Sequence, residues 1–119
     1  MPYLTEEGKA WIDAEPVRVK KPGELNYLIT KLLLDETSYA VLWDGVEIAV
    51  DLYVANNGAS YETYNSVMGV LLCASLEYTR RTNHNVPGGV LKEYAQYFYQ
   101  TVLVPYEDKK IKENGDVYE

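Results

Sequence analysis

One imidazole and one thiol offer the obvious reactive groups in this 119-residue sequence, at His84 and Cys73. A general base must lie within hydrogen-bond reach of its partner, and His84 stands in a polar segment of Asn and Gly that marks no such partner. Cys73 follows Leu71 and Leu72, and a cysteine on such a helix usually acts as a small buried hydrophobic residue. A hydrolase that uses His84 or the carboxylates is therefore less favoured than a binding function.

The acidic side chains do not form a metal-binding or acid–base pattern. Those that stand next to each other form three pairs, Glu6-Glu7, Asp35-Glu36 and Glu107-Asp108. Neighbours in sequence on a helix point about 100° apart, so these carboxylates do not converge on one ion. The sequence also contains no His-Glu-x-x-His, no glycine-rich phosphate loop and no Gly-x-Ser-x-Gly motif. We expect no catalytic residue, no metal and no cofactor.

Basic side chains beside tyrosines carry the first binding hypothesis. Tyr78 and Arg81 are three residues apart, and Tyr106 and Lys110 are four apart, so each pair shares one face of a helix. An aromatic ring beside a cation can hold a nucleobase and a phosphate. The alternative is an ordinary salt bridge, for example between Glu107 and Lys110. The candidate residues for binding a small anionic ligand are Tyr78, Arg80, Arg81, Tyr106, Lys109 and Lys110.

Acidic residues outnumber basic ones, with 18 Asp and Glu against 11 Lys and Arg and a net charge of −7. A chain of this charge is repelled by phosphate backbones, so we expect no nucleic-acid polymer as partner. No run approaches the ~18 apolar residues of a membrane span, and the first residues do not resemble a signal peptide. We therefore expect a cytoplasmic protein that does not bind a membrane.

Apolar residues at helical spacing predict a single compact all-α domain of about five helices over residues 1–119. The clearest stripe consists of Leu25, Leu28, Ile29, Leu32 and Leu33. A second stripe consists of Val46, Ala49, Val50, Tyr53 and Val54, and a third of Tyr64, Val67, Met68, Leu71, Leu72, Ser75, Leu76 and Tyr78. Thr5 and Ser60 are typical N-cap residues and are predicted to begin two of the helices.

Between the stripes, breaks in the pattern predict where the helices end. The apolar run Tyr39 to Trp43 is predicted to be a strand-like connector or a buried turn, and Asp44 with Glu47 resembles the entry of the next helix. Gly58 is predicted to end that helix with a left-handed residue. The segment Thr82 to Gly89 is predicted to be a loop.

The last helical region is predicted to run from Val90 to Glu113. Pro105 lies inside it and should kink or split it, because proline lacks an N–H and its ring clashes with an earlier carbonyl. Gly115 is predicted to end the helix in a left-handed conformation, which would turn the chain so that Val117 and Tyr118 pack on this subunit or on a neighbour.

Several blocks of the sequence resemble one family. They are Gly23 to Thr30 (GELNYLIT), Ser60-Tyr61 with Asn65 to Leu71 (NSVMGVL), Leu76 to Arg81 (LEYTRR) and Pro105 to Tyr118 (PYEDKKIKENGDVY), of which the last is the most specific. They resemble a family of small uncharacterised bacteriophage and prophage proteins. The family has no assigned activity, so the resemblance implies a phage-encoded protein in the host cytoplasm and no particular catalytic residue.

Two binding functions follow from these observations. The first is a non-enzymatic protein that sequesters a nucleotide-type signal of a host defence pathway. We expect such a protein to be a homo-oligomer, because small helical domains form concave sites more readily between subunits. The alternative is a protein-interaction module, either an inhibitor of a host protein or a part of the virion, which the 12 tyrosines favour.

Overall fold

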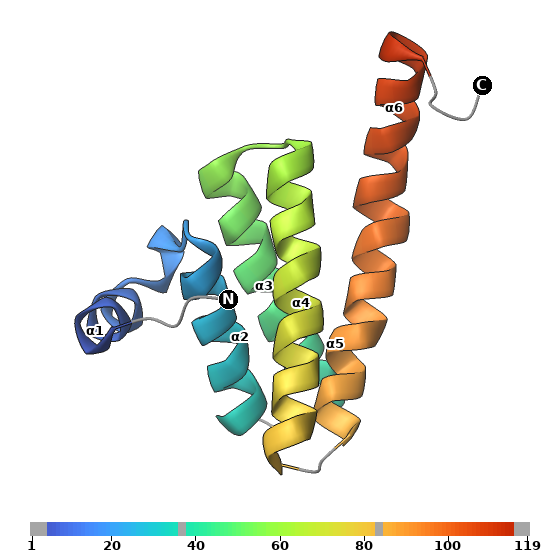
Figure 1. Ribbon diagram of the computed structural model, residues 1–119. Helices are drawn as coiled ribbons and strands as arrows, with labels where there is room; N and C mark the ends of the chain where they lie inside the picture. The colour runs from blue at the N-terminus through green and yellow to red at the C-terminus, as the bar shows by residue number, and fades with distance from the viewer. Residues whose placement is uncertain (1–4, 36–37, 83–84, 116–119) are drawn as a thin grey trace.

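Five helical rods form the part of the chain that the computed structural model describes, residues 5–35, 38–82 and 85–115 (Figure 1). The first four are α1 (Glu6–Ala14), α2 (Pro22–Asp35), α3 (Tyr39–Asn57) and α4 (Tyr61–Thr82). The fifth rod joins α5 (Asn85–Phe98), the π-helical segment η2 (Tyr99–Leu103) and α6 (Val104–Asn114). One short 3₁₀ turn, η1 (Pro16–Arg18), connects α1 and α2. These residues contain no strand, so the prediction of an all-α fold is confirmed.

The rods α2, α3, α4 and α5 lie side by side as a bundle, with α1 at its edge (Figure 1). The closest packing between rods joins α4 with α5, α2 with α4 and α2 with α3. The α6 end of the last rod extends beyond α4, and the molecule is elongated, with principal extents of 45 × 29 × 24 Å. None of the helices in the described residues combines the length and the apolar character that crossing a bilayer requires.

Side chains satisfy the free N–H groups at the first turns of α1 and α4, as predicted. The hydroxyl of Thr5 accepts a hydrogen bond from the backbone N–H of Gly8 at 3.1 Å. The hydroxyl of Ser60 accepts one from the N–H of Thr63, also at 3.1 Å. Each hydroxyl replaces an intrahelical acceptor that the first turn lacks.

Glycines with positive φ end α3 and α6 at the predicted positions, but their ψ angles of 155° and 161° are extended rather than those of a left-handed helical cap. Gly58 and Gly115 both have φ of 86°, and their N–H groups donate to Val54 and Ile111 at 2.7 and 2.8 Å. A residue with a Cβ adopts this backbone conformation only with strain. The predicted packing of residues 117 and 118 lies outside the described residues.

The buried face of each helix follows the predicted stripes, with one exception on α4. The core includes Leu25, Ile29, Leu33, Val46, Val50, Tyr53, Tyr64, Val67, Leu71, Leu91, Tyr94 and Phe98. The predicted stripe on α4 was too wide, because Leu72 and Leu76 are exposed. Ser75 of that stripe is buried as predicted, and Ala74, which the stripe did not include, is buried as well. Cys73 is also exposed, so the expectation of a buried thiol was wrong.

The prediction of a connector at Tyr39 to Trp43 was wrong, because these residues form the first turns of α3. Leu42 and Val46 both lie in the core, one helical turn apart, and Trp43 packs against a ring of α5. Asp44 therefore lies within the helix rather than at its start. The run shows no clear helical period, because aromatic or aliphatic residues stand on both sides of its buried face as well as on that face.

The predicted loop at Thr82 to Gly89 was too long, because α5 begins at Asn85. Pro87 falls in the first turn of α5, where a missing N–H removes no intrahelical bond. The last rod is split as predicted: η2 precedes α6, and Pro105 stands in the first turn of α6. The wider turn of η2 accommodates a proline that cannot donate to the preceding turn.

Candidate functional site

The first predicted group of basic residues lies at the C-terminal end of α4. Arg80 and Arg81 both donate to the carboxylate of Glu77, at 2.6 and 2.7 Å. These hydrogen bonds hold the pKa of Glu77 below its usual value, with Arg80 as the larger cause. The guanidinium groups are therefore brought together by a carboxylate within one turn, which the sequence analysis did not foresee, while Tyr78 packs against the core.

The second predicted group lies on α6. The ammonium of Lys110 stands 5.6 Å from the centre of the Tyr106 ring, so the expected pairing of cation and ring is present. Lys110 also pairs with Glu113 at 3.3 Å, rather than with Glu107 as the alternative had it. Lys109 is exposed one residue away.

The structure does not bring the two groups together within one chain. The Tyr106 ring packs edge-on against Tyr64, near the start of α4, at 5.2 Å between centroids. Arg80 lies sixteen residues further along the same helix, which corresponds to about 24 Å at a rise of 1.5 Å per residue. A single ligand of nucleotide size cannot contact both groups in one subunit.

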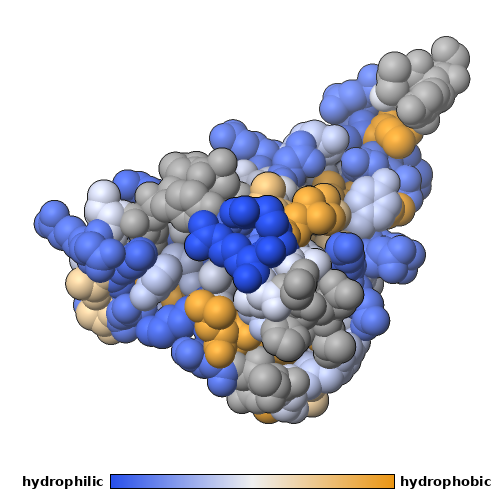
Figure 2. Space-filling view, turned by 60° about the horizontal axis from the view of Figure 1, so that its bottom comes forward, coloured by the Kyte–Doolittle hydropathy of each residue, from blue (hydrophilic) through white to orange (hydrophobic). Residues whose placement is uncertain are grey.

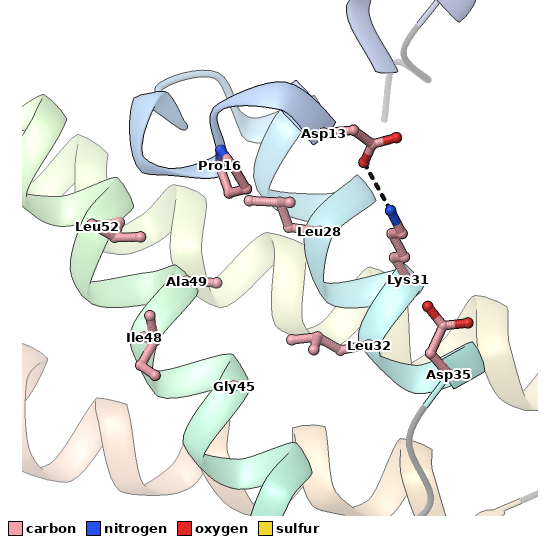
Figure 3. A pocket seen from close by; sticks show the side chains of 10 residues that line it. All are labelled: Asp13, Pro16, Leu28, Lys31, Leu32, Asp35, Gly45, Ile48, Ala49 and Leu52. Carbon is pink, nitrogen blue, oxygen red and sulfur yellow. Dashed lines mark hydrogen bonds and ion pairs between the residues drawn. The ribbon is translucent and has the colours of Figure 1, made fainter. Parts of the chain in front are cut away.

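A groove that the sequence analysis missed lies between α2 and α3 (Figure 3). Its volume is about 370 Å³, near the lower end of the range for ligand-binding pockets. Its residues are mainly aliphatic, with charges at the edge. The lining consists of Asp13, Pro16, Leu28, Lys31, Leu32, Asp35, Gly45, Ile48, Ala49 and Leu52.

Helical spacing on the two rods explains the apolar walls. Leu28 and Leu32 lie one turn apart on α2 and point toward α3 (Figure 3). On α3, Ile48 and Leu52 lie one turn apart and follow Gly45 on the same side. Gly45 allows the close approach of the helices, because a Cβ at this position would stand only 3.0 Å from a methyl carbon of Leu32.

A hydrogen-bonded triad of Asp13, Lys31 and Tyr27 lies at the α1 side of the groove. The carboxylate of Asp13 accepts hydrogen bonds from the Lys31 ammonium at 3.0 Å and from the Tyr27 hydroxyl at 2.8 Å. The bond from Lys31, and then the bond from Tyr27, hold the pKa of Asp13 below its usual value. The same bond raises the pKa of Lys31. Asp35 adds a second carboxylate at the end of α2.

One signal for the groove was present in the sequence. Val41, Gly45, Ile48 and Leu52 recur at helical spacing along one side of α3, beside Asp44. The stripe becomes visible only when Tyr39 to Trp43 is assigned to the helix. No sequence motif indicates that α2 is the helix that packs against these residues.

The described residues contain no group of three or more His, Cys, Asp or Glu side chains that could hold a metal ion. His84 lies outside the described residues.

Two comparisons with known proteins, one with curated proteins and one with solved structures, gave no match. A family model, by contrast, matches residues 1–117, almost the whole sequence. On this match the chain belongs to the family described as Domain of unknown function (DUF6899).

Proposed function

We propose that this chain is a non-enzymatic binding protein whose α2–α3 groove accepts an amphipathic helix from a partner protein. The observation that carries the proposal is the open aliphatic groove with an acidic edge. Grooves between two helices commonly receive a third helix through apolar side chains at i, i+3 or i+4, and i+7.

Exposed aliphatic side chains give such a helix its anchoring surface. Ile48 lines the groove and is 61% exposed. Val41, one helical turn before Gly45 on the same side of α3, is 50% exposed. Leu28, Leu32 and Leu52 are partly buried beneath them. Covering these side chains would remove apolar area from water, which is the main source of affinity in interfaces of this kind.

The charges around the groove favour a partner helix with basic flanks. Asp35 stands at one end of the groove, and exposed Asp44 and Asp51 lie within one turn of Ile48 on α3. The cation at the edge, Lys31, is already paired with Asp13. A second copy of this chain would bring its own acidic α3 against this face, and like charges disfavour that arrangement.

A designed peptide tests the proposal without knowledge of the natural partner. The probe is a fluorescein-labelled, 18-residue Leu/Lys amphipathic helix, titrated with the full chain and followed by anisotropy and by amide chemical shifts. We expect saturable binding with shifts confined to residues around Leu28, Leu32 and Ile48. A Leu/Glu peptide of the same pattern should not bind.

A matched pair of variants locates the binding surface. Ile48→Asp should weaken peptide binding at least tenfold, because it places a charge in the apolar interface. Leu76→Asp is the control, since Leu76 on α4 is equally exposed at 60%. Equal effects of both substitutions, or a Leu/Glu peptide that binds as well as the Leu/Lys peptide, would overturn the proposal. Dimerisation of the chain that Ile48→Asp abolishes would identify a second copy as the occupant.

A second candidate function is the binding of a small anionic ligand such as a nucleotide, favoured by the Lys110 ammonium beside the Tyr106 ring. The α4 and α6 basic groups would meet only between subunits, which agrees with an oligomeric, phage-encoded binder. Calorimetric titration with cyclic and linear nucleotides, combined with the native mass, tests this candidate. Binding that Lys110→Met abolishes would support it, and no heat with any nucleotide would exclude it.

A further inference from the structure

A second hollow lies at the first turns of α3, and it shares no lining residue with the groove. Its volume is about 300 Å³, and it is lined by Tyr39, Ala40, Trp43 and Asp44. The Tyr39 and Trp43 rings lie nearly parallel, at 21°, with centroids 6.1 Å apart.

Aromatic side chains of α5 complete the wall around Trp43. The ring of Tyr97 is 5.5 Å from the indole at 62°, and the ring of Tyr94 is 5.1 Å away at 75°. Tyr94 is buried and holds the indole from below, whereas Tyr39 and Tyr97 are about half exposed. The hollow itself is therefore lined by two aromatic rings, Tyr39 and Trp43, and the indole of Trp43 is held by its contacts with Tyr94 and Tyr97.

Carboxylates supply the charge of this site. Asp44 lines the hollow, and Glu93 of α5 accepts a hydrogen bond from the Tyr39 hydroxyl. This bond raises the pKa of Tyr39 and fixes the ring relative to α5. The four lining residues include one carboxylate and no cation.

Two further carboxylates act on the aromatic cluster from α3. The pKa of Tyr94 is raised, first by burial and then by the negative charges of Asp51 and Glu47. The same charges would stabilise a cation placed nearby. Ring faces and carboxylates thus act in the same direction, because the face of an aromatic ring also attracts positive charge.

We propose that this hollow binds an organic cation with dispersed charge, a methylated ammonium or a guanidinium group. Such cations are weakly hydrated, so they lose little when aromatic rings replace water. The group can come from a free small molecule or from a methylated lysine or arginine side chain of a protein. The hollow shares no lining residue with the α2–α3 groove, and only Asp44 contributes charge to both, so the choline titration and the Tyr39→Leu variant are independent of the peptide test above.

Fluorescence of Trp43 reports occupancy directly. The sequence has two tryptophans, so Trp11→Phe leaves Trp43 as the single tryptophan of the full chain, which is excited at wavelengths that the tyrosines do not absorb. The free-ligand arm uses choline, tetramethylammonium and methylguanidinium, and the protein arm uses short peptides with trimethyllysine, arginine or unmodified lysine. We expect a saturable change in emission with at least one of the methylated or guanidinium ligands, and tighter binding in the arm that matches the natural source.

Matched ligands and variants separate cation binding from plain hydrophobic binding. The neutral isostere of choline, 3,3-dimethylbutanol, should bind at least tenfold more weakly than choline. Tyr39→Leu should weaken binding of the cation about tenfold, whereas Tyr61→Leu should not, although both tyrosines are half exposed, at 50% and 51%. Asp44→Asn, at an exposed position, should weaken it several-fold without loss of folding. Equal binding of the neutral isostere, or no response of Trp43 to any ligand at tens of millimolar, would overturn the proposal.

Discussion

Substitution of two helical glycines by alanine tests how tightly α2 and α3 are packed. Glycine in a helix interior costs about 1 kcal/mol relative to alanine. A Cβ at Gly69 in α4 would meet nothing within 4 Å, so we expect Gly69→Ala to gain the whole of this amount. A Cβ at Gly45 would stand 3.0 and 3.1 Å from the two methyl carbons of Leu32. Moving Leu32 off its rotamer costs roughly 0.5–1.5 kcal/mol, so the net effect of Gly45→Ala should be close to zero.

Thermal and urea unfolding of both variants measure the difference. For a domain of this size 1 kcal/mol corresponds to about 4 °C in Tm, so Gly69→Ala should melt about 4 °C higher than the parent and Gly45→Ala should melt within about 2 °C of it. In a Leu32→Ala background, Gly45→Ala should recover a gain of about 1 kcal/mol, because the obstructing methyl groups are gone. An equal gain for Gly45→Ala and Gly69→Ala in the parent chain would refute the close contact between Gly45 and Leu32.

Three further predictions concern the core, the α1–α2 connection and one carboxylate. Leu71→Ala should lower the free energy of unfolding by about 2–5 kcal/mol, whereas Leu72→Ala, at a 45% exposed neighbour, should change it by less than about 0.5 kcal/mol in urea titrations. The Asn56 amide donates to two backbone carbonyls around η1, at 2.8 and 2.7 Å, so Asn56→Ala should cost about 1–3 kcal/mol in the same assay. Because its hydrogen-bonded partners lower the pKa of Asp13, the ionised form stabilises the folded chain above pH 3.8, and this contribution is lost as pH falls through the lowered pKa. Carboxyl NMR titration should give an Asp13 pKa below 3.8, and Lys31→Met should raise it; an unchanged value in this variant would contradict the ion pair.

The helices that the sequence predicts well are those whose apolar residues follow one clear period. Leu25, Ile29 and Leu33 are all buried on α2, and Gly58 ends α3 with the expected positive φ. Both features depend on interactions within a few residues, so a local pattern is sufficient to find them.

The features that the sequence did not predict depend on contacts between helices. The sequence did not predict the start of α3, because a short apolar run such as Tyr39 to Trp43 has no distinct helical or strand period. Gly45 is an unfavourable helix residue on its own, and its role appears only when Leu32 of α2 lies against it. The two basic groups were both found, but sequence spacing gives no distance between Arg80 and Lys110.

The segment η2 also determines which face α6 presents to the bundle. Phe98 and Leu103 are both buried, yet they are five residues apart, where a regular helix would repeat its buried face after three or four. The last rod therefore contains the equivalent of one inserted residue. Loss of any single residue between positions 99 and 102 would restore the regular period and rotate α6 by about 100° relative to α5. Tyr106 would then leave Tyr64, although no core residue had changed, so the orientation of α6 depends on the length of the chain in this segment as much as on its composition.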